Sequence, residues 1–546
     1  MKKSRVLVAV SLAICMVYQS VGCTKGDKEN EDSKQEIKVF SSFIAAKGTR
    51  RNEKNEVQNL IARKIGAKCE ETWLDENKDP ADAVSEMIIS GKYPDFIYGG
   101  TEQQKLIDAN ALIPLDEYLD GYDNLKNYFT EEEWNRLRSD DGHVYMMPQF
   151  CKVYMRDTLT THEGEAFWIQ VRVLKWAGYP ELKTLDEYFD VLERYIEANP
   201  TDENGNPNIG YEILTDGYLY FCLENPPQFL DGYPNDGSCI VDTEKLEAID
   251  YNTTPTAKKW FKKLNEEYHK GLIDPECFVL TADQYYEKIR SGNILGMVDQ
   301  HWNFRNAAAS LPEECSYVPF GIVIDESIES HYYTSVALDA SQGMGISVDC
   351  EDIEGAMKFL NDLLSPEILT MRAWGIKDVD YLVDENGLFY RTEEQKRQFD
   401  DNEYRDKHLC DYGYFPFYGG MNSDGINAFS PTNQPSEFFT KLSDIMKECF
   451  SAYGVQTYTE LLNEAEENPP WYPVWSYTNT FTPDTTYGKA KADMDTIKHE
   501  YLPRVVMSDD FESAWAEYMA AYNSNVDIKA YFDHLTAYIR KCAGEQ

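Results

Sequence analysis

Residues 90–100 read Ser-Gly-Lys-Tyr-Pro-Asp-Phe-Ile-Tyr-Gly-Gly, and this stretch decides the fold. The apolar run Phe96-Ile97-Tyr98 is followed by two glycines, which is the pattern of a buried strand that ends in a turn. A helix is expected over residues 80–90, because Val84, Met87 and Ile88 share one helical face and a glycine follows. The stretch therefore marks a helix-to-strand connection.

The preceding residues extend the same alternation of strand and helix. Residues 36–40, Glu-Ile-Lys-Val-Phe, alternate as a strand does. Apolar residues recur at helical spacing over 55–65, and residues 69–73 form a further short strand signal. The order strand, helix, strand, helix, strand predicts an α/β fold with a mainly parallel sheet covered by helices.

Residues 90–97 resemble the "SG-x-x-PD-hydrophobic" segment of the family-1 extracellular solute-binding proteins of ABC transporters. Further motifs that resemble this family follow in the expected order: Leu-Ile-Pro-Leu-Asp-Glu-Tyr at 112–118, Asp-Gly-His-Val-Tyr-Met-Met-Pro at 141–148, Thr-Leu-Asp-Glu-Tyr at 184–188 and Gly-Leu-Ile-Asp-Pro-Glu at 271–276. With the segment 291–302 and the helical C-terminal tail, they cover nearly the whole chain after residue 35. The large lipoprotein branch of the family is implied, and its members bind oligosaccharides.

The resemblance implies a two-lobed, periplasmic-binding-protein-like fold with a hinged ligand cleft that the chain crosses about three times. We expect lobe 1 to comprise residues 36–148 and about 340–430, and lobe 2 to comprise 149–339 and about 431–546. The length agrees with this expectation, because about 500 residues are too many for a single hydrophobic core.

The N-terminus predicts export and anchoring. A charged start is followed by an apolar run over residues 6–18, which is too short to span a bilayer as a helix. Residues 20–23, Ser-Val-Gly-Cys, resemble the bacterial lipobox, so residues 1–22 are a signal peptide and Cys23 carries the lipid. The alternative is plain secretion with Cys23 as a thiol. Residues 23–35 are almost wholly polar and are expected to be a flexible tether.

The composition limits the partners. The formal net charge of −43 repels nucleic acids and anionic lipid headgroups, so we expect neither as the main partner. No later segment is apolar enough to cross a membrane, which leaves the lipid as the only attachment. The resemblance implies ABC permease subunits as partners of a monomer. Ten cysteines after Cys23 are scattered without a CxxC motif, which favours free thiols and leaves one or two disulfides open.

Aromatic residues make up 13% of the chain, with 38 Tyr and 10 Trp, and they suggest a sugar ligand. Their flat faces suit the C–H face of a sugar ring. The first cluster, Asp299-Gln-His301-Trp302-Asn, follows a strand signal over 294–298. Strand ends face the ligand crevice in α/β lobes, so Trp302 is a candidate stacking platform, with Asp299 and His301 beside it. The alternative for Trp302 is a structural tryptophan.

Two further aromatic clusters lie later in the chain. Residues 471–479 and the residues just before them are rich in proline, so we expect an irregular loop at the cleft rather than a helix, with Trp471 and Trp475 as candidate ligand contacts. Residues 412–420 contain five aromatic residues, for which packing between the lobes is the favoured explanation. Ser42, which is expected to follow the first strand, and Tyr98, at the end of a later one, are candidate contacts by strand-end geometry.

Motifs for metals, cofactors and catalysis are missing. Residues 202–206, Asp-Glu-Asn-Gly-Asn, resemble the centre of an EF-hand loop, but Pro200 and Tyr211 then occupy positions that need carboxylates, so a turn is the better interpretation and no metal or cofactor is expected. The sequence contains no HExxH, GxSxG or GxxxxGK[ST] motif. The predicted function is capture of oligosaccharides for an ABC transporter. The alternatives are a surface glycan-binding lipoprotein without a transporter and, less favoured, an enzyme acting on glycosides.

Overall fold

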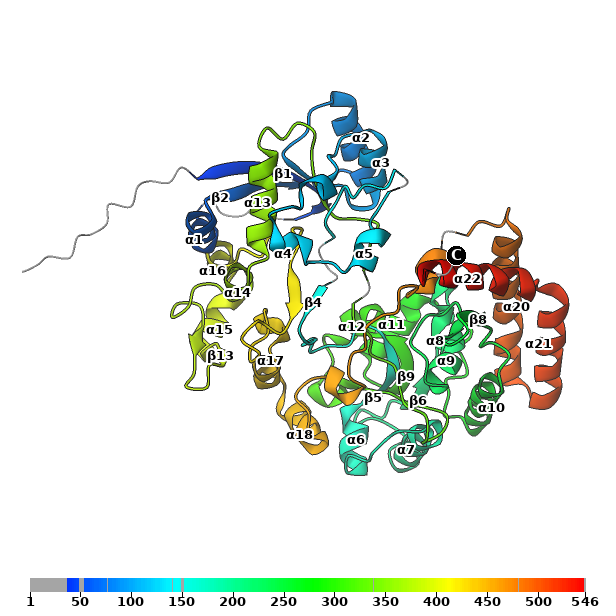
Figure 1. Cartoon of the computed structure of the whole chain (residues 1–546). Coiled ribbons are helices and arrows are strands. Elements are labelled where there is room, and N and C mark those ends of the chain that lie inside the picture. Colours follow the sequence, from blue (N-terminus) through cyan, green and yellow to red (C-terminus); the bar gives the residue numbers. More distant parts are fainter. Residues whose placement is uncertain are drawn as a thin grey trace, which may run out of the picture.

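The computed structural model describes residues 37–48, 54–75, 77–139, 141–148, 152–336, 338–479 and 481–544. The two main hydrophobic cores are each built around a four-stranded sheet, and Figure 1 shows the two lobes that result. The predicted signal peptide, Cys23 and the tether lie outside the described residues.

The sheet of lobe 1 has the strand order β11-β3-β1-β2. Its strands are β1 (Lys38–Lys47), β2 (Ala67–Leu74), β3 (Phe96–Tyr98) and β11 (Met344–Ile346). β1 pairs in parallel with both β2 and β3, whereas β11 is antiparallel to β3. Helices α1 (Glu56–Ile65) and α2 (Pro80–Ser90) connect the parallel strands. The α/β fold with a parallel sheet, predicted from the sequence, is confirmed.

Local signals explain where these elements begin and end. The Asn55 side chain accepts a hydrogen bond from the backbone N–H of Gln58 and caps α1, and Asp79 caps α2 in the same way. Gly91, with φ of 60°, ends α2 in the left-handed conformation. The Pro-Asp motif joins two strands, because Oδ2 of Asp95 accepts hydrogen bonds from the backbone N and Oγ of Ser41 at 2.7 and 2.8 Å.

Each face of the lobe 1 sheet is covered by helices. Phe40 and Ile44 of β1 point into one core, which also holds residues of α13 (Ile353–Leu363) and α14 (Pro366–Trp374). Ala45 points to the opposite face, into a smaller core with α2 and α3 (Gln103–Asp108). This alternation follows from the two-residue period of a strand.

The sheet of lobe 2 has the order β10-β5-β9-β6. Its strands are β5 (Glu165–Gln170), β6 (Ile209–Glu212), β9 (Ile294–Gln300) and β10 (Tyr317–Phe320). β9 is parallel to β6 and antiparallel to β5. The core includes residues of α7 (Leu185–Ala198), α10 (Pro255–Lys270), α20 (Thr486–Met507), α21 (Phe511–Asn525) and α22 (Ile528–Cys542). The Thr-Leu-Asp-Glu-Tyr motif is the start of α7, where Thr184 and Glu187 form a capping box.

The remaining elements are short. The helices are α4 (Asp123–Lys126), α5 (Glu131–Arg136), α6 (Val171–Ala177), α8 (Phe221–Glu224), α9 (Pro226–Leu230), α11 (Ala282–Arg290), α12 (His301–Ala308), α15 (Glu393–Asp400), α16 (Asn402–His408), α17 (Pro435–Lys441), α18 (Asp444–Tyr453) and α19 (Val474–Thr478). The strands are β4 (Lys152–Tyr154), β7 (Ile240–Asp242), β8 (Glu247–Ile249), β12 (Leu382–Val383), β13 (Phe389–Tyr390) and β14 (Tyr418–Gly420). The 3₁₀ helices are η1 (Gly100–Glu102), η2 (Leu115–Tyr118), η3 (Gly217–Tyr220), η4 (Glu313–Cys315), η5 (Pro431–Asn433) and η6 (Thr459–Leu461).

Two pairings involve segments that connect the lobes. β4 pairs in parallel with β14, and Figure 1 shows β4 between the two lobes. A separate bridge joins Thr334 to Glu466. Paired extended segments of this kind can bend with little loss of packing, so they are the candidate hinge.

The cysteines and the hydropathy agree with the sequence analysis. Eight of the nine described cysteines are buried, and Cys222, Cys239, Cys277, Cys315, Cys350, Cys449 and Cys542 are free thiols. None of the helices in the described ranges is long and apolar enough to cross a membrane.

Candidate functional site

The carboxyl end of β9 is the edge at which lobe 2 presents its candidate site. The first six of the seven residues of β9 are buried, and α12 begins directly after the strand. Gln300, the last residue of β9, lies opposite Glu165, the first residue of β5. Ligands of open α/β sheets bind beyond the carboxyl ends of the strands, which makes this edge the candidate binding edge of lobe 2.

Three aromatic residues lie at this edge, and we call them the aromatic wall: Tyr218, Phe221 and Trp302. The indole of Trp302 is 40% exposed, and its Nε1–H donates to Oε1 of Gln300. The ring of Phe221 lies 6.1 Å from the indole, centroid to centroid. Tyr218 precedes Phe221 in the same turn and is 78% exposed. An exposed indole whose N–H is already bonded presents a flat apolar face, as stacking on a sugar requires.

Asp299 lies beneath the aromatic wall and has no exposed surface. Its Oδ2 accepts hydrogen bonds from the O–H of Tyr285 at 2.8 Å and the amide of Asn303 at 3.0 Å, and its Oδ1 accepts one from the backbone N of Gln300 at 2.7 Å. Burial raises the pKa of Asp299 to about 6. The prediction of direct ligand contact is therefore corrected. Because Asp299 still belongs to the strand, its side chain points inward and fixes the turn that carries Trp302.

His301 is partly buried at the start of α12. Its ring stacks on Trp168, with centroids 5.3 Å apart, and its Nδ1 lies 3.3 Å from Oε1 of Glu163. Arg305 pairs with the other oxygen of Glu163 at 2.8 Å. Burial lowers the pKa of His301. The imidazole is thus fixed beside Trp302, and its predicted contact with ligand stays a prediction.

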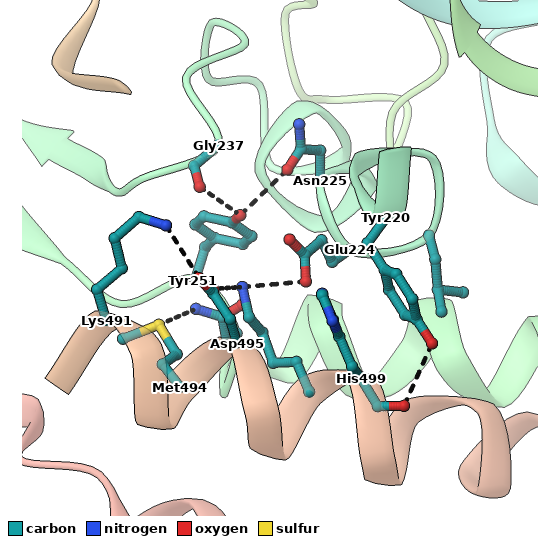
Figure 2. Close-up of polar contacts among 12 residues, drawn as sticks. Tyr220, Glu224, Asn225, Gly237, Tyr251, Lys491, Met494, Asp495 and His499 are labelled. Carbon is teal, nitrogen blue, oxygen red and sulfur yellow. Dashed lines mark hydrogen bonds and ion pairs between the residues drawn. The ribbon is translucent and has the colours of Figure 1, made fainter. Parts of the chain in front are cut away.

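A buried carboxyl group next to Gln300 was not identified from the sequence. Oε2 of Glu165 accepts hydrogen bonds from the amides of Asn225 at 3.1 Å and Asn235 at 3.4 Å. Oδ1 of Asn225 in turn accepts one from the O–H of Tyr251, as Figure 2 shows. Burial, reinforced by the nearby Asp299, raises the pKa of Glu165 well above its usual range. With 95 acidic residues in the chain, no sequence signal singles this one out.

The aromatic segment 468–479 is more regular than expected. Residues Val474–Thr478 form the short helix α19, which corrects the predicted irregular loop. The reason is the position of the prolines, which all precede the helix, where proline is tolerated. Trp471 is buried in the lobe 2 core, so it supports the segment instead of facing a ligand. Trp475 is 47% exposed.

Lobe 2 holds this segment by polar and stacking contacts. Oδ2 of Asp236 accepts a hydrogen bond from the backbone N of Val474 at 2.7 Å. The ring of Tyr477 stacks on Tyr538 of α22, with centroids 3.9 Å apart, and its hydroxyl group lies 2.8 Å from Nε2 of His534. The exposed indole of Trp475 therefore stands on a rigid support.

In lobe 1, three aromatic residues near the carboxyl ends of the strands pack against one another. We call Trp73, Tyr98 and Tyr414 the lobe 1 cluster. Tyr98 ends β3, is 5% exposed and donates from its hydroxyl group to Oε1 of Gln342 at 2.6 Å. Tyr414 meets both other rings edge to face, at 4.6 Å from Tyr98 and 5.2 Å from Trp73. These rings mainly hold lobe 1 together.

Two other sequence expectations concern lobe 1. Ser42 does not follow the first strand, because β1 continues to Lys47, and Ser42 is buried within it. Residues 412–420 are divided between two roles. Tyr412 and Phe415 belong to the lobe 1 core, whereas Tyr418 begins β14 in the connecting segment.

The loop after Tyr98 needs its glycines. Gly100 has φ of 58°, and a Cβ atom on Gly99 would lie 2.8 Å from the side chain of Leu106. The backbone N of Gly99 donates to Oε1 of Gln103 at 2.7 Å, which closes the turn. The backbone is thus held tightly at the edge where lobe 1 would meet a ligand.

The Asp202–Asn206 segment forms a turn. Oδ1 of Asp202 accepts hydrogen bonds from the backbone N atoms of Asn204 and Asn206 at 2.9 and 2.8 Å. The Asp202 carboxylate thus accepts hydrogen bonds from the backbone of its own turn. Over the described ranges, no group of three or more His, Cys, Asp or Glu side chains is arranged to hold a metal ion.

Comparison with known proteins finds similar proteins, although no family model matches the chain. It is 24% identical over 305 residues to the lipoprotein LipO of Bacillus subtilis, covering 54% of this chain and 55% of LipO. It is 26% identical over 315 residues to FusA, the fructooligosaccharide ABC transporter substrate-binding protein of Streptococcus pneumoniae, covering 52% of this chain and 55% of FusA. The chain thus spans about half the length of the curated relatives it matches.

The structural likeness extends further. The structure of an HMO-binding, ABC-transporter-associated solute-binding protein from Bifidobacterium longum infantis is similar with a TM-score of 0.60, over 93% of this chain and 100% of that protein, at 15% identity. The FusA structure with fructo-nystose gives a TM-score of 0.56 over the same shares, also at 15% identity. The chain therefore has the two-lobed fold of the extracellular solute-binding proteins of ABC transporters, as its sequence motifs predicted.

Proposed function

We propose that the protein is a lipid-anchored, extracytoplasmic solute-binding protein that captures oligosaccharides and delivers them to an ABC permease. The observation that carries the proposal is the aromatic wall, an exposed indole fixed at the carboxyl end of β9. The fold supports it, because it is shared over nearly the whole chain with proteins described as binding fructo-oligosaccharide and HMO.

The ligand would lie between the lobes. One sugar ring stacks on Trp302, a second contacts Trp475, and the amide of Gln300 reaches sugar hydroxyl groups. Asp299 and Trp471 are buried and hold the segments that carry these residues. In lobe 1, the turn after Tyr98 closes on the opposite side of the sugar chain.

Closure would follow from contacts that exist only when both lobes touch the sugar. The paired strands β4 and β14 and the bridge between Thr334 and Glu466 provide the hinge. The protein acts as a monomer and binds its ligand without chemical change. The acidic surface favours uncharged ligands over polyanions.

Calorimetric titration of the fragment 36–546 with a panel of uncharged oligosaccharides that includes kestose tests the proposal. We expect at least one sugar to bind and to reduce the radius of gyration measured by X-ray scattering. A Trp302→Ala variant is the matched control and should bind the same sugar more weakly. Binding of peptides with no response to any glycan would overturn the proposal.

The proposed delivery of the sugar to a permease is tested in cells. A strain that lacks the protein should lose uptake of the sugar that the fragment binds. Normal uptake in that strain would favour a surface glycan-binding lipoprotein without a transporter. The anchor is tested by Cys23→Ser, which should release the protein from the membrane fraction and abolish incorporation of labelled fatty acid. Retention of the variant in the membrane fraction would contradict lipidation.

A further inference from the structure

Two neighbouring residues of α20, Lys498 and His499, contact the segment that carries the aromatic wall, and Figure 2 shows His499 beside Tyr220. Nζ of Lys498 lies 3.0 Å from Oε2 of Glu224, the last residue of α8. The ring of His499 stacks on Tyr220, with centroids 3.7 Å apart, and the Tyr220 hydroxyl group donates to the His499 carbonyl oxygen at 3.2 Å. Tyr220 and Glu224 lie on either side of Phe221 in the sequence, so α20 holds this part of the wall at both ends.

The ion pair is shielded from water. The side chain of Lys498 is 4% exposed and that of Glu224 is 13% exposed. Asp495 lies 3.5 Å from Lys498 and is also paired with Lys491 at 2.9 Å. Burial disfavours the charge of Lys498, but attraction by Glu224 and Asp495 outweighs it and raises the lysine pKa. A buried charge of this kind is tolerated only because it is paired.

Lys498 contacts α8, and the position of α8 depends on its contacts with neighbouring elements. α8 has only four residues, and a helix this short has no stability of its own. On its other sides, the Cys222 thiol group donates to Oδ1 of Asp299 at 3.5 Å, and Nε1 of Trp260 donates to the Leu223 carbonyl oxygen at 2.9 Å. Glu224 is the residue through which α8 meets α20.

We propose that Lys498 is a positioning residue of the aromatic wall, because through Glu224 it fixes α8 and thereby the placement of Phe221 beside Trp302. The C-terminal helices thus act on the site without touching the ligand. The consequence for affinity rests on the proposed function, whereas the consequence for the geometry of the unliganded protein does not.

The test compares Lys498→Met with a control on the same helix. The variant keeps the length of the side chain and removes its charge. We expect backbone amides in residues 217–224 to exchange with deuterium about 100-fold faster, because one charge of a buried pair is left unpaired. The amides of β3 should be unchanged. Lys491→Met is the matched control, because Lys491 is 33% exposed and, among the described residues, is paired with Asp495 alone. It should leave residues 217–224 unchanged.

Two further variants separate positioning from general stability. Lys498→Arg retains the charge and should exchange like the unmodified protein. The double variant Lys498→Met, Glu224→Gln removes both charges and should restore slow exchange. The fluorescence of Trp302 is obtained by subtracting the spectrum of the matching protein that carries Trp302→Phe. Its emission maximum should shift to longer wavelength in Lys498→Met and return to the original wavelength in the double variant. Should Lys498→Met fail to fold, Glu224→Gln carries the same test.

The outcomes decide between the roles. Faster exchange spread evenly over lobe 2, including α7, would make Lys498 a general stabilising residue and overturn the proposal. Unchanged exchange in residues 217–224 would overturn it as well. Titration with kestose measures the binding affinity, which should weaken in Lys498→Met and recover in the double variant. If the unmodified protein does not bind kestose, exchange and fluorescence decide the positioning role without it.

Discussion

The two lobes use their aromatic residues differently. In lobe 1, Trp73, Tyr98 and Tyr414 pack edge to face, and Tyr98 is 5% exposed. In lobe 2, Trp302 and Trp475 expose 40% and 47% of their surface. Of these five residues, Trp73, Tyr98 and Trp302 lie in, or directly follow, the carboxyl-terminal part of a strand. We therefore propose that lobe 2 supplies the flat surface for a ligand, while the aromatic residues of lobe 1 stabilise their own lobe.

The largest expected effect is on the stability of lobe 1. Tyr98→Ala should lower the free energy of unfolding by about 3 kcal/mol, because it leaves a cavity and removes the partner of Gln342. Tyr98→Phe keeps the ring and should cost about 1 kcal/mol. Denaturant unfolding measures both values. Full stability of Tyr98→Ala together with lost binding would show that lobe 1 also presents a ligand platform, and the comparison would fail.

The second effect is on binding by lobe 2. Trp302→Ala should weaken sugar binding by about 1 to 3 kcal/mol, the usual contribution of a stacking anchor, and should hardly change the melting temperature. Calorimetry and thermal unfolding of the same samples measure the two quantities. Unchanged affinity with a large fall in melting temperature would make Trp302 a structural residue like those of the lobe 1 cluster.

The third effect is a pH dependence of lobe 2, which is smaller than the two effects above over any single pH unit. Burial raises the pKa of Asp236 from 3.8 to about 7, so the folded state holds this proton more tightly than the unfolded state. Stability should therefore fall as the pH rises from about 4 to about 7, by at most about 1.4 kcal/mol per pH unit for this group. Asp236→Asn should reduce this slope in denaturant unfolding. An identical slope in the variant would exclude Asp236 as its source.

The smallest expected effect is on the ligand itself, which should be returned intact. Both lobes would then serve only to hold the sugar, and chromatography after long incubation should recover it unchanged. Product that increases with protein concentration and disappears in Glu165→Gln would reassign the buried carboxyl group near Gln300 to catalysis. The proposed ligand site between the lobes would then be an active site.

Much of lobe 1 was predictable because its signals are local. The predicted helix over 80–90 has the same bounds as α2, and capping residues explain why. The strand before Trp302 was also anticipated. The errors concern side-chain direction: Asp299 and Ser42 are buried because each lies within a strand that extends beyond its apolar signal. One more residue of strand reverses the face to which a side chain points.

The sequence by itself determined the α/β alternation and the excess of acidic residues, and it predicted the export signal and the two-lobed fold, because these depend on local pattern, motifs and composition. Only the tertiary structure decided which aromatic residues are exposed and which neighbours support them. Phe221 meets Trp302, and Lys498 meets Glu224, across long stretches of chain. Such contacts arise when helices and strands pack, so the abundance of Tyr, Trp, Asp and Glu hides them in the sequence.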